Sequence, residues 1–320
     1  MRFRTIASVV AGAAALALAV SGCSSSSTPS ASSVASAAQS VASQAQSAAS
    51  SVASRASSAV SSVQSAVSGA VADSQVLASA KDGKLVVGIK FDQPGLGIKN
   101  PDGTFSGFDV EVAKYVANKL GVDPANIEFK ESKSAERENL ITGGEVDYIV
   151  ATYSITDTRK EKVNFAGPYF IAHQDLLVKA DNTEITGPDA MSGKILCSVT
   201  GSTSAQKVKD KYAADVALQE FGTYTECVEA LKTGVVDAVT TDDVILAGFA
   251  AQDPGQFKLV GKGFSDENYG IGLKKGDAAG TTAINAAIAA MIADGSWAQA
   301  LKDTVGPSGY TIPAPPTPAS

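Results

Sequence analysis

The sequence predicts an α/β fold made of two lobes. From about residue 84 onward, short apolar runs alternate with segments of helical periodicity, which is the pattern of a sheet covered by helices. Residues 140–152 (LITGGEVDYIVAT) also resemble residues 231–242 (LKTGVVDAVTTD), since each has a Leu, a Thr-Gly turn, a Val-Asp pair and a short apolar strand. This repeat indicates two similar half-proteins, and the chain is too long for one average domain.

Residues 1–22 are organised as a targeting segment and not as a folded element. Arg2 and Arg4 precede an apolar stretch at residues 6–20. The following Val20-Ser21-Gly22-Cys23 resembles a bacterial lipobox, which implies cleavage before Cys23 and attachment of diacylglycerol to its sulfur, with palmitate as the expected acyl chain. We therefore expect an anchor on the outer face of the cell membrane. The alternative is an ordinary secretory signal peptide followed by a chance cysteine.

Residues 23–72 are predicted to form a linker. They consist mostly of Ser, Ala, Val and Gln and contain no aromatic residue that could seed a core. Valines between Val34 and Val71 recur on one face of a helix, but the many serines oppose helix formation. We expect a partly helical spacer, with a coiled coil as the alternative.

Lobe 1 is predicted to comprise residues 73–172 and 265–320. Residues 85–91 (LVVGIKF) form a near-continuous apolar strand, as in parallel sheets that are covered on both faces. A helix opens at Gly107 and stops at Gly121. The remaining elements are strands at 126–130, 146–152 and 269–274, a short helix that ends at 142, and helices at 283–294 and 297–303. We expect Trp297 in the core and a disordered tail from Pro313.

Lobe 2 is predicted to comprise residues 173–264. A strand at 194–199 runs into Thr200-Gly201-Ser202-Thr203-Ser204, a glycine and hydroxyl loop that opens a helix. Free N–H groups at such a helix start can bind a small anion, although the loop could be only a helix cap. The other expected elements are strands at 175–179, 235–240 and 257–260 and helices at 227–233 and 243–252.

Polar groups follow both repeated strands. Three hydroxyl residues and then Arg159 come after the first strand, and Asp242 comes after the second. Ligands of open α/β sheets bind outside the carboxyl ends of the strands, so Arg159 is placed to hold a carboxylate with two hydrogen bonds. A cation that faces an anion suits a zwitterion such as an α-amino acid. The alternatives are a solvated Arg159 and an Asp242 that only caps the next helix.

Two motifs carry a resemblance to a known family. Ser154-Ile-Thr156-Asp-Thr-Arg159 and the Phe165-Ala-Gly167-Pro168-Tyr169 ending resemble the extracellular solute-binding proteins of family 3, which are the amino-acid receptors of ABC importers. The resemblance covers residues 84–303. It implies a type II periplasmic-binding-protein-like fold whose lobes are joined by a two-strand hinge near residues 171–174 and 261–266, with His173 in the hinge. It also implies a monomeric receptor without cofactor or metal, which delivers its ligand to a permease.

The same resemblance assigns roles to individual residues. It implies that Arg159 binds the α-carboxylate of the ligand and that Asp242 binds the α-ammonium. Further polar contacts are expected from two side chains and two loop N–H groups: Ser154, Thr152, Ser202 and Thr203.

The family also suggests which residues contact the ligand's side chain. Ser134-Ala-Glu-Arg137 matches an S-x-x-R element that binds the distal carboxylate in the glutamate/aspartate branch, and Lys90 stands where that branch can place a second cation. Phe91 opens an FDQPG turn that resembles glutamate receptors of Gram-positive actinobacteria. Glutamate or aspartate is therefore favoured. Tyr224 stands near a position where one sub-branch has a histidine, so glutamine and asparagine stay open, and Arg137 and Lys90 could instead be a solvated charge pair.

The three cysteines are interpreted through the expected compartment. If Cys23 carries the lipid, Cys197 and Cys227 remain in an oxidising environment, which favours a disulfide between them over two separate buried thiols. Such a bond would close a loop of about 30 residues and contribute roughly 3–4 kcal/mol. No metal site is predicted, because His173 is the only histidine and no close Cys pair exists.

Three classes of function compete. The first is a binding protein that closes around an amino acid, the second is an enzyme such as a dehydratase on the same scaffold, and the third is a sensor for a separate receptor chain. The sequence offers no acid–base constellation beyond the binding groups and no nucleophile motif, so we do not expect an enzyme. A net charge of −7 argues against a nucleic-acid partner. No run in the folded region is apolar enough to span a membrane.

Overall fold

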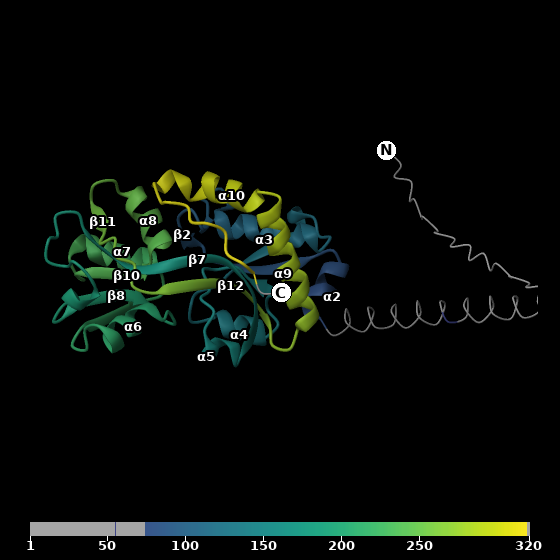
Figure 1. Cartoon of the computed structure of the whole chain (residues 1–320), viewed down its shortest axis with the longest axis horizontal. Helices are drawn as coiled ribbons and strands as arrows, with labels where there is room; N and C mark the ends of the chain where they lie inside the picture. Colours follow the sequence, from purple (N-terminus) through teal and green to yellow (C-terminus); the bar gives the residue numbers. More distant parts are fainter. Residues whose placement is uncertain (1–54, 56–73, 319–320) are drawn as a thin grey trace, which may run out of the picture. The chain divides into compact units, whose positions relative to one another are not determined.

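The computed structural model describes Arg55 and residues 74–318. The predicted signal peptide, Cys23 and, apart from Arg55, the predicted linker lie outside these residues. Residues 74–318 form a nine-stranded sheet and a separate three-stranded sheet, with helices on both sides of the large sheet (Figure 1). The α/β prediction is therefore confirmed. None of the helices in this region is both long and apolar enough to cross a bilayer.

The large sheet has two long strands at its centre. Its order is β5 (Ile127–Glu131), β1 (Leu85–Ile89), β6 (Tyr148–Ile149), β12 (Asp266–Lys274), β7 (Val163–Lys179), β10 (Ala238–Asp242), β8 (Ile195–Val199) and β9 (Ala217–Phe221). Strand β11 (Phe257–Leu259) also pairs with β7. β1 is parallel to β5 and β6, and β8 is parallel to β9 and β10, whereas β7 and β12 run antiparallel to their neighbours. The small sheet consists of β2 (Asp92–Gln93), β3 (Gly97–Lys99) and β4 (Phe105–Ser106).

Strand β7 divides the large sheet into two lobes. Its residues up to His173 pair with β12, and its residues from Gln174 onward pair with β10 and β11. We call the side with β5, β1, β6 and β12 lobe 1, and the side with β10, β8, β9 and β11 lobe 2. At the change of partner, Gln174 exchanges backbone hydrogen bonds with Phe264 and Ser265, inside the two segments predicted as the hinge.

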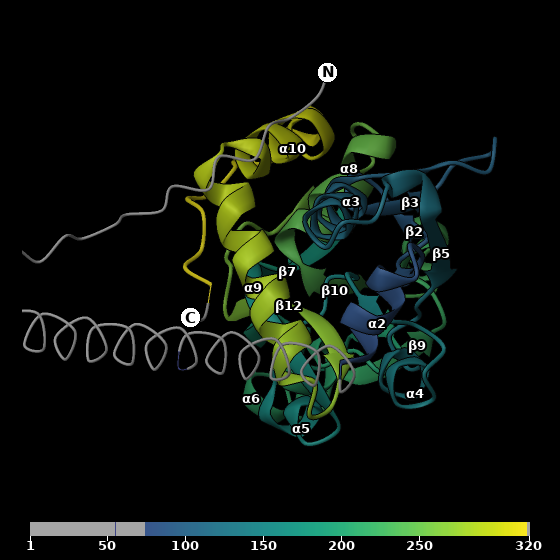
Figure 2. The same ribbon diagram turned by 90° about the vertical axis from the view of Figure 1, so that its right-hand side faces the viewer.

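Helices cover both faces of each lobe. In lobe 1, α2 (Gln75–Lys81), α3 (Phe108–Lys119), α9 (Ala278–Ala293) and α10 (Ser296–Thr304) pack together, and α4 (Arg137–Thr142) and α5 (Asp157–Lys160) lie on the other side of the sheet from α3 and α10 (Figure 2). In lobe 2, α7 (Tyr224–Thr233) and α8 (Asp243–Gln252) lie opposite α6 (Ser204–Lys211) (Figure 1). Three short 3₁₀ turns complete the described elements: η1 (Pro124–Asn126), η2 (Pro188–Met191) and η3 (Gly306–Ser308).

The hydrophobic core follows these layers. One cluster extends across both lobes and contains buried side chains of α3, α9, α7 and α8, while two smaller clusters lie under α6 and under α4. Trp297 is 2% exposed, packs against Phe108 and donates its indole N–H to the Tyr169 carbonyl, so its predicted place in the core is confirmed. The predicted disulfide between Cys197 and Cys227 is present, which makes the alternative of two free thiols wrong.

The sequence repeat has a structural counterpart in the two lobes. The Asp147 carboxylate accepts the backbone N–H of Val86 at 2.8 Å, and the Asp237 carboxylate accepts that of Ile195 at 2.7 Å. Each aspartate thus ties its own strand, β6 or β10, to the parallel strand beside it. The repeated Val-Asp pair is explained by this shared bond.

Several predicted boundaries were wrong. Ladder pairing in residues 146–152 is confined to β6, although every residue of that segment is buried. The helix predicted at 283–294 begins earlier, because Asp277 accepts the N–H of Gly280 and caps α9. Residues 313–318 of the tail, which were predicted to be disordered, follow the folded region: Pro316 is buried, and Tyr310 and Ile312, just before them, pack against the main core. The prediction of disorder is therefore wrong for residues 313–318.

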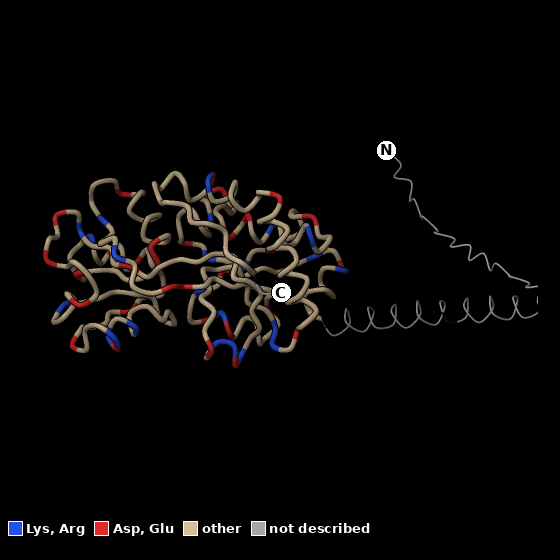
Figure 3. The backbone as a smooth tube through the Cα atoms, in the orientation of Figure 1, with Lys and Arg blue, Asp and Glu red and all other residues tan. Residues whose placement is uncertain are grey.

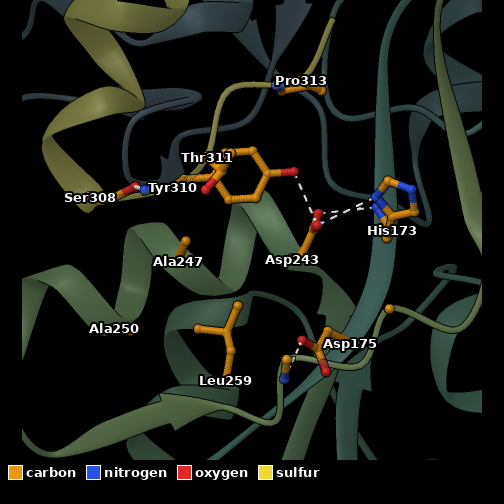
Figure 4. Close-up of a pocket in the computed structure, with 13 residues that line it drawn as sticks. His173, Asp175, Asp243, Ala247, Ala250, Leu259, Ser308, Tyr310, Thr311 and Pro313 are labelled. Carbon is orange, nitrogen blue, oxygen red and sulfur yellow. Dashed lines mark hydrogen bonds and ion pairs between the residues drawn. The ribbon is translucent and has the colours of Figure 1, made fainter.

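The hinge is bordered by charged side chains and the C-terminal tail. The His173 side chain lies 3.6 Å from Asp243 and 3.3 Å from Asp266, measured between nitrogen and oxygen atoms. The Tyr310 hydroxyl donates to the same Asp243 carboxylate oxygen, Oδ2, at 3.0 Å (Figure 4). The tail of lobe 1 therefore bonds directly to the start of α8 in lobe 2.

Candidate functional site

A small cavity lies between the lobes, at the ends of β6 and β10. Its volume is only about 20 Å³, roughly the space of one water molecule. Every predicted ligand residue except Lys90 and Phe91 lines it. Lobe 1 and lobe 2 both contribute, and the lining residues are Ser134, Arg137, Thr152, Ser154, Arg159, Ser202, Thr203, Ser204, Tyr224, Thr241, Asp242 and Ile245.

Arg159 is held in place from both lobes. It lies in α5, a short helix that starts where Thr156 accepts the Arg159 backbone N–H. The guanidinium donates to the Ser154 carbonyl at 2.8 Å and, across the lobes, to the Gly201 carbonyl at 3.1 Å, and its Nε lies 3.4 Å from the Glu138 carboxylate. Because only 7% of Arg159 is exposed, the alternative of a solvated arginine is wrong.

Arg137 is a second buried cation beside the cavity. It is 2% exposed, and its guanidinium donates to the Ala151 carbonyl at 3.1 Å. Burial, followed by the neighbouring Arg159 charge, lowers the pKa of Arg137 to about 10. Within the described part of the chain, Arg137 forms no ion pair with a carboxylate. A buried cation without an acidic partner is costly, which indicates a place for an anion.

Lys90 and Phe91 lie behind the cavity wall. The Lys90 ammonium donates to the Ser134 hydroxyl at 2.9 Å, and Ser134 itself faces the cavity. Lys90 is 4% exposed, and burial, followed by the Arg137 charge, lowers its pKa to about 7. A solvated charge pair is therefore wrong for both Lys90 and Arg137. Phe91 is half-buried and packs against Phe105, with 5.0 Å between the ring centroids.

Thr152 adopts a backbone conformation that is rare for a β-branched residue. Its φ is +45°, in the left-handed region. The Asp109 carboxylate accepts the Thr152 N–H at 3.0 Å and the Tyr169 hydroxyl at 2.8 Å, and burial raises the pKa of Asp109 to about 6. The buried carboxylate of α3 thus fixes the strained residue that ends the repeated segment.

Asp242 provides the anionic wall. It occupies the N-cap position of α8, but its side chain makes no capping bond, so the capping alternative is wrong. Instead it accepts the Tyr269 hydroxyl of lobe 1 at 2.5 Å. Asp242 is 5% exposed, and burial, followed by the charge of Glu267, raises its pKa to about 7. It pairs with no Lys, Arg or His among the residues that the structure describes.

The loop before α6 closes the cavity on the lobe 2 side. Gly201 has φ of +80°, and a Cβ there would lie 2.6 Å from the Ala135 Cα of lobe 1, so only glycine allows this approach. The side chain of Thr203 does not cap α6, whereas the Ser202 hydroxyl accepts that of Tyr224 at 3.2 Å. The loop is therefore built into the contact between the lobes and is more than a helix cap.

Several residues of the site were missed. Ser204, Thr241 and Ile245 line the cavity, and Tyr269 bonds to Asp242. Thr241 could have been inferred from its place beside Asp242 at the strand end. Tyr269 has no such signal, because it approaches Asp242 from a distant strand of the other lobe.

Burial, not the number of charges, distinguishes the site. Acidic and basic residues are interspersed over both lobes (Figure 3), but the cations near the cavity are desolvated, and two of them, Arg137 and Lys90, form no ion pair with a carboxylate of residues 74–318. Hydroxyl groups and one carboxylate face them. No cluster of His, Cys, Asp and Glu that could hold a metal occurs among the described residues. The arrangement suits a small zwitterion that carries an additional negative charge.

Comparison with known proteins gives the same picture. Residues 85–306 match the bacterial extracellular solute-binding proteins, family 3. The chain is 52% identical over 246 residues to the glutamate-binding protein GluB of Corynebacterium glutamicum. The aligned region covers 74% of this chain and 83% of that protein. It is 40% identical to the glutamine-binding protein GlnH of Bacillus subtilis, over 71% of this chain and 83% of that protein.

Solved structures confirm the type II periplasmic-binding-protein fold. An ancestral arginine-binding protein bound to glutamine matches with a TM-score of 0.66 and 37% identity, over 70% of this chain and 98% of that chain. Family, fold and cavity agree, and the enzyme alternative falls because the family and these relatives are solute-binding proteins. The chain belongs to the bacterial extracellular solute-binding proteins of family 3 and is a receptor of the ABC-importer type.

Proposed function

We propose that this receptor binds an acidic amino acid, with glutamate or aspartate preferred, and delivers it to an ABC permease. The observation that carries the proposal is the pair of buried cations, Arg137 and Lys90, which have no acidic partner in residues 74–318. Arg159 and Asp242 would bind the α-carboxylate and the α-ammonium, leaving this pair for the distal carboxylate. The glutamate-binding relatives from Corynebacterium support the assignment.

In this proposal, the remaining contacts come from hydroxyl and N–H groups. Ser134 contacts the distal carboxylate directly and Lys90 acts through it, because the Lys90 ammonium bonds to the Ser134 hydroxyl. Thr152, Ser154, Ser202 and Thr203 complete the shell around the α-carbon. Phe91 lies outside the cavity lining and would act only through the lobe 1 wall.

Glutamine or asparagine is the second candidate ligand. Lys90 does not line the cavity and bonds to Ser134, which does. Tyr224, which carries a hydroxyl group, lines the cavity. The relatives named for glutamine, at 40% and 43% identity, favour this candidate. A neutral side-chain amide would require no second cation, so the two candidates predict different roles for Arg137.

A thermal-shift panel of the twenty amino acids on the purified protein tests the proposal. A ligand at a hundred times its dissociation constant should add about 2.7 kcal/mol to the free energy of unfolding. Glutamate or aspartate should produce the largest shift, and Arg137→Gln should remove that advantage while Lys114→Gln, a surface control, retains it. A larger shift with glutamine would replace the acidic ligand, and no shift with any amino acid would contradict the proposal.

We further propose that residues 73–172 and 265–320 move as lobe 1 and residues 173–264 as lobe 2 of a monomer. The change in pairing of β7 between His173 and Gln174 supports these limits. Ligand entry would require the lobes to separate about β7 and β12.

We also propose that the mature protein begins at a lipid-bearing Cys23 and is held on the outer face of a Gram-positive cell membrane. The lipobox-like VSGC sequence supports this proposal. Mass spectrometry of the N-terminal peptide should show the lipid. Cys23→Ser should abolish the lipid-bearing peptide, and an N-terminal Cys23 peptide of unmodified mass in the wild type would contradict a lipid anchor.

A further inference from the structure

We propose that Tyr153 is a specificity-determining residue, because its ring positions the guanidinium groups of Arg137 and Arg159 and thereby favours a dicarboxylate ligand over its amide. The inference rests on the proposed function. Tyr153 is a positioning residue: it does not line the cavity and none of its surface is exposed.

Both arginines contact the Tyr153 ring. The guanidinium carbon of Arg137 lies 4.1 Å from the ring centroid, and that of Arg159 lies 5.0 Å from it. A desolvated cation is attracted to the negative face of an aromatic ring, and arginine also stacks on it. The ring therefore gives two like charges a common support where water cannot stabilise them.

The ring itself is rigidly held. Its hydroxyl donates to Glu138 at 2.7 Å, and Phe165 packs against it with 4.8 Å between the ring centroids. Gly272 of β12 also abuts the ring, since a Cβ at this glycine would lie 2.8 Å from a Tyr153 ring carbon. Contacts from three elements thus fix the ring, and the ring constrains the two guanidinium groups.

Glu138 explains why this support affects specificity. Its carboxylate interacts with Tyr153 and Arg159 but forms no ion pair with Arg137, although Glu138 follows Arg137 directly in α4. The ring thus keeps Arg137 directed at the main-chain carbonyls of Ala151 and Thr152 beside the cavity. Without the ring, Arg137 can turn toward Glu138, and its charge would no longer be available to a distal carboxylate.

The test compares glutamate and glutamine binding in the full-length wild type and three full-length variants by calorimetry. Tyr153→Phe keeps the ring and should retain the wild-type affinity ratio within about threefold. Tyr153→Leu removes the ring and should weaken glutamate binding at least about tenfold more than glutamine binding, which is a change of about 1.4 kcal/mol in discrimination. Phe165→Leu removes one of the contacts that fix the ring, and its ratio should shift in the same direction as in Tyr153→Leu but by less.

An unchanged affinity ratio in Tyr153→Leu would overturn the inference, whether both affinities fall equally, which indicates a purely structural role, or neither falls. If Tyr153→Leu does not fold, Tyr153→Met fills a similar volume without an aromatic face and should show the same change in ratio. In addition, Glu138→Gln in the ringless background should restore glutamate binding in part. A wild-type protein that does not bind glutamate would refute the proposed function itself, which is a distinguishable outcome.

Discussion

The two lobes contain the same strand segment, but it leads to a cation in lobe 1 and to an anion in lobe 2. In lobe 1, residues 140–152 lead through β6 to the cavity, and in lobe 2, residues 231–242 lead there through β10. Asp147 and Asp237 make the same bond to the neighbouring parallel strand. The scaffold is therefore shared, and the difference arises after the strand.

That difference lies in how each segment ends. In lobe 1 the strained Thr152 turns the chain into a hydroxyl-bearing loop that ends at Arg159, whereas in lobe 2 the strand continues into Asp242 and α8. The first ending delivers a cation supported by carbonyls, and the second delivers a carboxylate supported by Tyr269. A repeated scaffold can thus bind the two ends of a zwitterion by changing only the residues at the strand end.

Removing the charge of Arg159 or of Asp242 should have the largest effect on ligand affinity. The two losses should be similar, because each lobe binds one end of the zwitterion. Arg159→Ala and Asp242→Ala each leave a buried ligand charge without its partner, which costs roughly 3–5 kcal/mol, so affinity should fall at least about a hundredfold. Calorimetry with the preferred amino acid measures this loss, and Lys160→Ala, which removes an exposed neighbouring cation, serves as the control. Near-wild-type affinity in a folded Arg159 or Asp242 variant would refute the assignment.

The disulfide between Cys197 and Cys227 should stabilise lobe 2 more than lobe 1. The disulfide ties β8 to α7 in lobe 2, and the described part of lobe 1 has no counterpart. Replacing Cys197 and Cys227 by Ala should lower the free energy of unfolding by roughly 3–4 kcal/mol. Hydrogen exchange should show faster opening of lobe 2 than of lobe 1, with Cys23→Ser as the control. Equal acceleration in both lobes would show that they unfold as one unit.

Below about pH 7, the dependence of ligand affinity on pH should reflect the protonation of Asp242 in lobe 2. We call this range the acid limb of the pH profile. The pKa of Asp242 is raised to about 7, so the free protein binds a proton there below this pH. An ammonium group favours the ionised carboxylate, and the proton must leave on binding. Affinity should therefore fall as the pH drops below about 7, by up to about tenfold per unit. A flat profile between about pH 5.5 and about pH 7 would contradict the role of Asp242.

The alkaline limb should report on lobe 1. The pKa of Lys90 is lowered to about 7, so its charge is lost in the free protein as the pH rises above this value. Glutamate affinity should then decline, because recovering the proton opposes binding. Glutamine affinity should not decline in this range. Lys90→Met should remove the alkaline limb and leave the acid limb in place, and persistence of the alkaline limb in this variant would exclude Lys90 as its source.

A contact between the lobes should give the smallest effect. Asp92 of lobe 1 accepts the Tyr224 N–H at 3.0 Å and thus stabilises the start of α7 in lobe 2. Asp92→Ala should weaken closure by about 1 kcal/mol, the usual value of a lost helix cap. Because Asp92 does not line the cavity, glutamate and glutamine should both weaken about fivefold. Asp102→Ala, in an exposed turn of lobe 1, is the control, and a change in the affinity ratio would show that Asp92 acts on the ligand itself.

The sequence alone determined the features that depend on short-range pattern. Apolar runs and turn glycines predicted most of the strands and helices, and the repeat predicted two related lobes with Arg159 and Asp242 at their strand ends. The resemblance to the family added Ser134, Arg137, Ser202 and Thr203, which the structure brings to the same cavity. The sequence could place these residues because each position depends only on the residue's own strand or loop, whereas their roles in binding stay predictions.

Only the tertiary structure determined which side chains from distant parts of the sequence contact one another. Tyr269 reaches Asp242 from another lobe, Asp109 holds Thr152 from a separate helix, and Tyr153 supports two arginines from behind the cavity. The order in the C-terminal tail likewise depends on a core that it contacts only after folding. Local periodicity records which side of an element is buried, but not which remote side chain meets it, because those contacts are set by the packing of the whole sheet.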